Sequence, residues 1–203
     1  MIHGCDLYHG DPMVDVTKFD FVFHKATQGT WFTDPVCQER IAQVRDAGKL
    51  AGMYHFMTTT DPIQAQFDYF IKQSNPQPGD VLALDFENDG HWPSLTSLDL
   101  VNMANTFMRL LAELVPSHRS LLYCDKTDWA NIVVPFGVFT NDGPWIASPG
   151  SEPVGPQRFW QYGSDIVDYD RGYFASLQEA KDWANGFVPI VVGPNQQKLQ
   201  LED

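Results

Sequence analysis

The stretch LALDFEND, residues 82–89, decides how this chain is expected to fold. It is apolar for three residues and then places Asp85, Glu87 and Asp89 at alternate positions. A short apolar run of this kind is typical of a strand buried in a parallel sheet. Side chains two residues apart on a strand point to the same face, so Asp85 and Glu87 share a face while Phe86 points to the other. The stretch predicts a buried strand that ends in paired carboxyl groups.

Apolar segments of similar length occur on both sides of this stretch and alternate with helical patterns. The predicted strands are residues 2–7, 19–26, 50–56, 81–86 and 120–124, followed by strand-like segments at 144–147, 158–162 and 165–169. Alternating strands and helices favour a parallel sheet, and eight strands are enough to close a barrel filled with side chains. We therefore expect an α/β fold with a single domain, an irregular TIM-like (β/α)5(β)3 barrel.

Capping residues and apolar periodicity predict four helices. They are expected to begin after Asp34, after Asp61, near Ser97 and after Ser176, and to end near Gly48, Ser74, Val115 and Gly186, respectively. Asp34 and Asp61 are each followed by proline, which predicts an N-cap acceptor with proline in the first helical position. The barrel is expected to span residues 1–186, and residues 187–203 to form a C-terminal strand or linker tail.

Composition excludes several classes of protein. The chain has 203 residues and a formal net charge of -13, with only 13 Lys and Arg, which speaks against a nucleic-acid binder. No segment approaches the roughly 20 apolar residues that span a bilayer, so no membrane partner is expected. The first residues lack the basic start and apolar core of a signal peptide. We expect the protein to be made in the cytoplasm of its host.

Cysteine and histidine patterns favour neither a disulfide framework nor a metal site. The three cysteines are odd in number and far apart, which predicts reduced, buried thiols. The six histidines form no HxxxH pair and there is no CxxC, so no zinc site is expected. There is also no GxSxG motif around a serine nucleophile. The sequence predicts no metal and no cofactor.

Four acidic residues fall at or just beyond the ends of predicted strands. Asp6 ends the first, Asp85 and Glu87 end the fourth, and Asp168 ends the last. Active residues of TIM-type barrels gather at the C-terminal strand ends, so these carboxyl groups are predicted to meet at one mouth. Crowding and burial favour keeping one protonated, and a protonated acid beside an ionised one suits the hydrolysis of a glycosidic bond. The spacing leaves retaining, inverting and substrate-assisted routes open.

Aromatic and amide side chains near the strand ends are candidates for binding a sugar. The predicted substrate-binding residues are Tyr54, Tyr123, Trp31, Gln161 and Tyr162. An aromatic face offers apolar contact to a pyranose ring, although core packing is the alternative for each of the aromatic residues and backbone hydrogen bonding for the amide. For Trp145 and Trp160 packing is favoured, and a structural role is favoured for His55.

Seven motifs between residues 4 and 174 resemble glycoside hydrolase family 25 in order and content, and the resemblance covers residues 2 to about 186. They are GCDLYHG (4–10), FHKATQGTWFTDP (23–35), AGKLAGMYHF (47–56), LALDFEN (82–88), PWIA (144–147), FWQYGS (159–164) and VDYDRGYF (167–174). This family contains the Chalaropsis-type lysozymes, or N-acetylmuramidases, many of them bacteriophage endolysins. The resemblance implies a (β/α)5(β)3 barrel without a cofactor. It also implies hydrolysis of the β-1,4 bond between N-acetylmuramic acid and N-acetylglucosamine in bacterial peptidoglycan.

The resemblance also assigns roles to the acidic residues. Glu87 matches the acid and base of the family and Asp85 its partner carboxylate, while Asp6 and Asp168 match two further acids lining the site. From these matches we expect Asp6 and Asp168 to raise the pKa of Glu87. A phage-type endolysin would be released to the cell wall by a separate membrane pore.

Two positions depart from the family pattern. Gln28 stands where relatives often carry glutamate, and Asp170 replaces an amide that follows the last motif's aspartate. Asp170 therefore competes with Asp168 for its assignment.

Two rival functions remain open. One is a glycan-binding barrel without turnover, and the other is a different peptidoglycan hydrolase, an amidase or peptidase. The paired Asp85 and Glu87 speak against a pure binder, and the lack of a zinc set or an exposed cysteine nucleophile speaks against the second.

Overall fold

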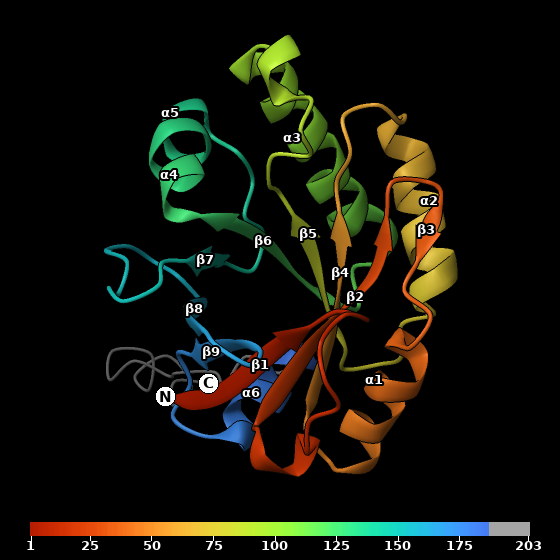
Figure 1. Cartoon of the computed structure of the whole chain (residues 1–203), viewed down its shortest axis with the longest axis vertical. Coiled ribbons are helices and arrows are strands. Elements are labelled where there is room, and N and C mark those ends of the chain that lie inside the picture. Colours follow the sequence, from red (N-terminus) through yellow and green to blue (C-terminus); the bar gives the residue numbers. More distant parts are fainter. Residues whose placement is uncertain (187–203) are drawn as a thin grey trace, which may run out of the picture.

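The eight predicted strands close into a barrel in the computed structural model, which describes residues 1–186 (Figure 1). The strands are β1 (Ile2–Leu7), β2 (Phe21–Gln28), β4 (Leu50–Phe56), β5 (Val81–Asp85), β6 (Arg119–Asp125), β7 (Pro144–Ala147), β8 (Phe159–Ser164) and β9 (Asp168–Gly172). Neighbours from β1 through β8 are parallel, whereas β9 is antiparallel to both β8 and β1. The prediction of an irregular TIM-like single-domain barrel is confirmed. The tail predicted for residues 187–203 lies outside the described residues.

A helix or helical turn follows each of the first five barrel strands, which gives five irregular βα units, and one more helix follows β9. The helices and turns are η1 (Val16–Lys18), α1 (Cys37–Asp46), α2 (Ile63–Ser74), η2 (Trp92–Ser94), α3 (Ser97–Leu114), α4 (Lys126–Asp128), η3 (Trp129–Val133), α5 (Val134–Phe136) and α6 (Leu177–Ala184). The first unit has only the 3-10 turn η1, and the fifth has a run of short helical turns from α4 to α5. Figure 1 shows α1, α2 and α3 along one side of the barrel. None of the helices in the described part is long and apolar enough to cross a membrane.

Side chains alternate between the barrel interior and the layer under the helices. On β5, Val81 and Ala83 belong to the interior cluster, and Leu82 and Leu84 belong to the outer one. The interior is filled largely by aromatic rings, including Phe21, Phe23, Trp145 and Phe159. Space for them comes from small inward residues: a Cβ atom at Gly4 would lie 2.5 Å from the Phe21 ring. The barrel is thus a packed core rather than a channel.

The helix α6 covers the end of the barrel where the parallel strands begin. Its Ala180 and Ala184 are buried in the interior cluster. Lys181 donates to the carbonyl of Gly48 at 3.1 Å, just before β4, and Arg119 at the start of β6 donates to the carbonyl of Trp183 at 2.8 Å. Functional side chains are therefore presented at the opposite end, where the parallel strands finish.

The predicted N-caps of the first two helices are wrong, and the helices begin two residues and one residue later than expected. α1 begins at Cys37 and α2 at Ile63, and neither has a side-chain cap. The Asp34 carboxyl accepts from the backbone N–H of His9 at 2.7 Å and of Val36 at 3.1 Å. The Asp61 carboxyl accepts from the N–H of Thr30 at 3.0 Å. Both acids tie loops together instead of capping a helix.

The last strand also differs from its prediction. β9 covers residues 168–172 instead of 165–169, and Asp168 begins it rather than ending it. Because β9 runs antiparallel to β1, with Asp168 paired to Asp6, its first residue lies at the same end as the last residues of the parallel strands. Asp168 therefore reaches the mouth for a different topological reason than expected. The prediction also missed the helical turns between β6 and β7, and the two-residue strand β3 (Phe32–Thr33).

Candidate active site

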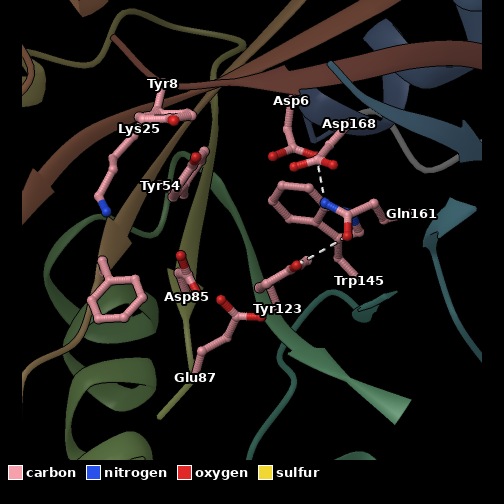
Figure 2. A pocket seen from close by; sticks show the side chains of 11 residues that line it. Asp6, Tyr8, Lys25, Tyr54, Asp85, Glu87, Tyr123, Trp145, Gln161 and Asp168 are labelled. Carbon is pink, nitrogen blue, oxygen red and sulfur yellow. Dashed lines mark hydrogen bonds between the residues drawn. The ribbon is translucent and has the colours of Figure 1, made fainter. Parts of the chain in front are cut away.

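A pocket of about 220 Å³ opens at the C-terminal ends of the parallel strands (Figure 2). Its lining residues are Asp6, Tyr8, Lys25, Tyr54, Phe56, Asp85, Glu87, Tyr123, Trp145, Gln161 and Asp168. One water molecule takes roughly 30 Å³ of liquid volume, so the pocket admits a group much larger than water. All four predicted carboxyl groups line this pocket.

The carboxyl groups form two pairs on facing sides of the pocket. Figure 2 shows Asp85 beside Glu87 on one side and Asp6 beside Asp168 on the other. Asp6 and Asp168 come from paired positions of β1 and β9, whereas Asp85 is the last residue of β5 and Glu87 follows it by two. The alternation of β5 continues past its end, because Phe86 is buried in the outer core while its two acidic neighbours face the pocket.

Asp85 is the more deeply placed member of its pair. It is buried, and its Oδ1 receives no hydrogen bond from residues 1–186. Burial, followed by the charge of Glu87, raises the pKa of Asp85 well above its usual range, and the ammonium group of Lys25 opposes this shift. Glu87 is only half-buried, so its carboxyl is the one that an entering substrate can reach more easily.

The pKa of Glu87 is also raised. Burial is the largest cause, followed by the charge of Asp125, with a smaller contribution from Asp128. The hydroxyl of Tyr123 and the charge of Lys25 act in the opposite direction and lower the pKa of Glu87. The charges that raise the pKa of Glu87 most are thus those of Asp125 and Asp128. The sequence analysis had instead predicted Asp6 and Asp168.

The sequence analysis missed the two acids that lie near Glu87, Asp125 and Asp128. Asp125 ends β6 and caps α4, where its Oδ1 accepts from the N–H of Thr127 at 2.6 Å and of Asp128 at 2.7 Å. Burial and the charge of Asp125 raise the pKa of Asp128 to about 6. Recognising Asp125 as another acid at a strand end was possible from the spacing after Tyr123.

Lys25 is a lining residue that the sequence analysis missed. Its Nζ donates to Gln28 Oε1 at 2.9 Å and lies 4.4 Å from the centre of the Phe56 ring. Burial lowers the pKa of Lys25, while the charges of Asp85 and other acids raise it. The signal lay in β2, where Phe21, Phe23 and Lys25 alternate toward the interior.

Gln161 connects the two sides of the pocket. Its Nε2 donates to Asp6 Oδ2 at 2.8 Å, and its Oε1 accepts from the Tyr123 hydroxyl at 3.1 Å (Figure 2). Tyr54 also lines the pocket, and its hydroxyl donates to the carbonyl of Leu7 at 3.2 Å. These three predicted binding residues face the pocket, yet each is more than 90% buried and also supports the barrel.

The other two predicted binding residues are not among those that line the pocket. Trp31 is 65% exposed at the turn between β2 and β3. Tyr162 lies under the guanidinium of Arg171, 4.6 Å from its ring centre, and stacks on Tyr169. Their roles in binding stay predictions.

The residues expected to be structural are packed as such, with one exception. His55 is fully buried and hydrogen-bonds to Thr27 and Gln66. Trp160 donates to the carbonyl of Ser148 at 3.0 Å and does not line the pocket. Trp145 is 1% exposed but forms part of the pocket wall, which makes it both core and lining.

All three cysteines are buried as free thiols, and burial raises the pKa of each. Such thiols are poor nucleophiles, because the thiolate is the reactive form. Among residues 1–186, no three His, Cys, Asp or Glu side chains are grouped as a metal site.

Comparisons with known proteins bear on the family and the fold of this chain. The model of the family described as "Glycosyl hydrolases family 25" matches residues 13–170. A muramidase from Trichobolus zukalii is similar in structure at 24% identity and a TM-score of 0.81, over 92% of this chain and 100% of its own. No curated protein sequence matches.

Two further solved structures share the fold. A bacterial lysozyme from Streptomyces coelicolor has 22% identity and a TM-score of 0.78, over 92% of this chain and 98% of its own. The catalytic domain of the endolysin ply40, from bacteriophage P40 of Listeria monocytogenes, has 19% identity and a TM-score of 0.70, over 89% of this chain and 97% of its own.

Proposed function

This chain belongs to glycosyl hydrolases family 25, and we propose that it is a muramidase of bacterial peptidoglycan. It hydrolyses the β-1,4 bond between N-acetylmuramic acid and N-acetylglucosamine. The observation that carries the proposal is the pairing of buried Asp85 with half-buried Glu87 in one open pocket, with the pKa of Glu87 raised. The solved muramidase and lysozyme structures of the same fold support the choice of substrate.

Glu87 is the proton donor in this proposal. Its raised pKa keeps the carboxyl protonated at a pH where an ordinary glutamate is ionised, and its position gives it access to the glycosidic oxygen. After the bond breaks, the same group is ionised and takes a proton from the attacking water. Asp85 acts in its ionised form, which the charge of Lys25 favours, and stabilises the positive charge that develops on the sugar.

The unpaired Oδ1 of Asp85 supports two routes to the product. It attacks the anomeric carbon directly, or it accepts the N–H of the 2-acetamido group, which then acts as the nucleophile. Peptidoglycan lacking the N-acetyl group on muramic acid separates the routes, because it is resistant only when the acetamido group takes part.

We also propose an endolysin role, in which the protein accumulates inside a host cell and is released to the wall by a separate membrane pore. The support is the similarity to the catalytic domain of a phage endolysin. Expression inside bacteria should cause no lysis until the membrane is permeabilised with chloroform. Lysis before permeabilisation would contradict the need for a pore.

Mass spectrometry of digested, purified peptidoglycan tests the enzymatic proposal. We expect new reducing ends that carry N-acetylmuramic acid. N-acetylglucosamine at the new ends would mean that the other glycosidic bond is cut. Freed amino groups without new reducing ends would indicate an amidase or peptidase, and binding without any product would indicate a glycan-binding barrel.

A further inference from the structure

Behind the pocket lies a second acidic residue on β9 that the proposed reaction does not use. Asp170 has the same inward orientation as Asp168, two residues away, but it is fully buried and does not line the pocket. Its carboxyl neighbours that of Asp6, because Gln161 is paired with Asp170 across β8 and β9 and its side-chain amide donates to Asp6. Two neighbouring carboxyl groups can hydrogen-bond to each other only if one of them holds a proton.

The other side chains that donate hydrogen bonds to Asp170 and Asp6 are uncharged. Trp145 Nε1 donates to Asp170 Oδ1 at 2.8 Å, and Gln161 Nε2 donates to Asp6 Oδ2 at 2.8 Å. Asp170 Oδ2 is buried and receives no hydrogen bond from any N–H or O–H group of residues 1–186. In the same part of the chain, no ion pair includes either acid.

A buried carboxylate oxygen without a donor or counter-ion is costly, but the same oxygen becomes a donor once it is protonated. Burial and the charge of Asp168 raise the pKa of Asp6 to about 8. Asp6 nevertheless borders the pocket and is 6% exposed, whereas Asp170 is 0% exposed, so we place the proton between them on Asp170. The other titratable groups that act on Asp170 reinforce this assignment, because the neighbouring charge of Asp168 also disfavours its ionisation. Tyr123 and Cys5 lie nearby with their own pKa values raised, and both are neutral.

We propose that Asp170 is a positioning residue: it remains a neutral carboxylic acid, accepts a hydrogen bond from Trp145, and donates one to the carboxyl of Asp6. Asp6 is thereby held from behind by Asp170 and from the side by Gln161, with its carboxyl facing the pocket. The role in turnover depends on the proposed glycan hydrolysis, but the proton on Asp170 does not.

The isosteric variant Asp170→Asn tests this arrangement, because an amide supplies the same acceptor for Trp145 and the same donor for Asp6. We expect Asp170→Asn to keep turnover on peptidoglycan within twofold of the wild type. Asp170→Leu removes both hydrogen bonds, and we expect its kcat to fall at least tenfold with KM within twofold. Equal losses in both variants would overturn the proposal, and so would wild-type turnover in Asp170→Leu.

Equilibrium unfolding at pH 5 and pH 7 detects the proton directly. An unfolded aspartate ionises near pH 3.9, so a native state that keeps the proton becomes less stable as the pH rises above that value. One retained proton changes the unfolding constant about tenfold per pH unit. Relative to Asp170→Asn, the unfolding constant of the wild type should rise about a hundredfold between pH 5 and pH 7.

A ratio that does not change with pH would show that Asp170 is ionised in the folded protein and would overturn the proposal. This measurement tests whether Asp170 is protonated even if Asp170→Leu fails to fold. Absence of glycan hydrolysis by the wild-type protein would instead contradict the proposed function, while the unfolding ratio would still report the proton.

Discussion

The amide of Gln161 donates to the carboxyl of Asp6 at 2.8 Å and joins β8 to β1. The same amide accepts from the Tyr123 hydroxyl on β6, so one neutral side chain links three strands. Nothing in this network carries a compensating positive charge, and its geometry therefore depends on complete hydrogen bonding.

We expect Gln161→Leu to lower turnover roughly tenfold, because Asp6 and Tyr123 lose their shared partner and their fixed orientation. Losing two buried hydrogen bonds should also lower the free energy of unfolding by about 1–3 kcal/mol. Initial rates of reducing-end release and denaturant unfolding measure the two effects. The control is Gln157→Leu, since Gln157 hydrogen-bonds to Pro153 and Tyr173 outside the pocket. A loss of turnover in the control equal to that in Gln161→Leu would contradict the specific role.

Replacing Glu87 by glutamine keeps the shape of the side chain and removes its transferable proton. We expect Glu87→Gln to lower turnover by at least about a hundredfold, the scale of general acid catalysis. Its unfolding midpoint should not fall, because the half-buried carboxyl is already an unfavourable group to ionise in the pocket. Release of new reducing ends is the measurement, with exposed Glu113→Gln on α3 as the control. Near-normal turnover in Glu87→Gln would remove it from the mechanism.

Much of the fold was predictable because the alternation of side chains sets both faces of each strand. β5 was predicted from its apolar run, and the acidic residues at its end continue the alternation of inward and outward side chains. β9 was placed three residues too early, since it alternates Asp168 and Asp170 with Tyr169 and Arg171 and has no apolar face to read.

The site was predictable where a side chain stands at the end of a recognisable strand, and less so elsewhere. Asp6 and Asp85 followed from this rule. Lys25 was missed because a lysine inside a barrel contradicts the usual exposure of charged residues, and only its register with Phe23 reveals that it points inward. The N-cap expected at Asp34 failed because a tertiary contact with His9 competes for the carboxyl, which no local pattern reports.

The charge of Asp125 raises the pKa of Glu87, so removing that charge should lower it. The acid form of Glu87 is lost as the pH rises through its pKa, and the alkaline limb of the pH–rate profile should therefore move to lower pH. For Asp125→Asn we expect a shift on the order of half a pH unit. Asparagine keeps the acceptor that caps α4, so the fold should be preserved. Asp46→Asn, an exposed change at the C-terminal end of α1, is the control. A shift to higher pH would contradict the assignment.

Replacing Lys25 should shift the acidic limb of the pH–rate profile. Its charge lowers the pKa of Asp85, which must be ionised to stabilise the sugar cation, and activity is lost as the pH falls through that pKa. Lys25→Met keeps the length of the side chain and removes the charge, so the pKa of Asp85 should rise and the acidic limb should move to higher pH. We expect a shift on the order of one pH unit, together with lower turnover at neutral pH, because the lysine is half-buried beside the acid. The pH dependence of kcat, measured on soluble glycan fragments, checks this, with exposed Lys18→Met as the matched control. An acidic limb that stays in place would mean that Lys25 does not control the charge of Asp85.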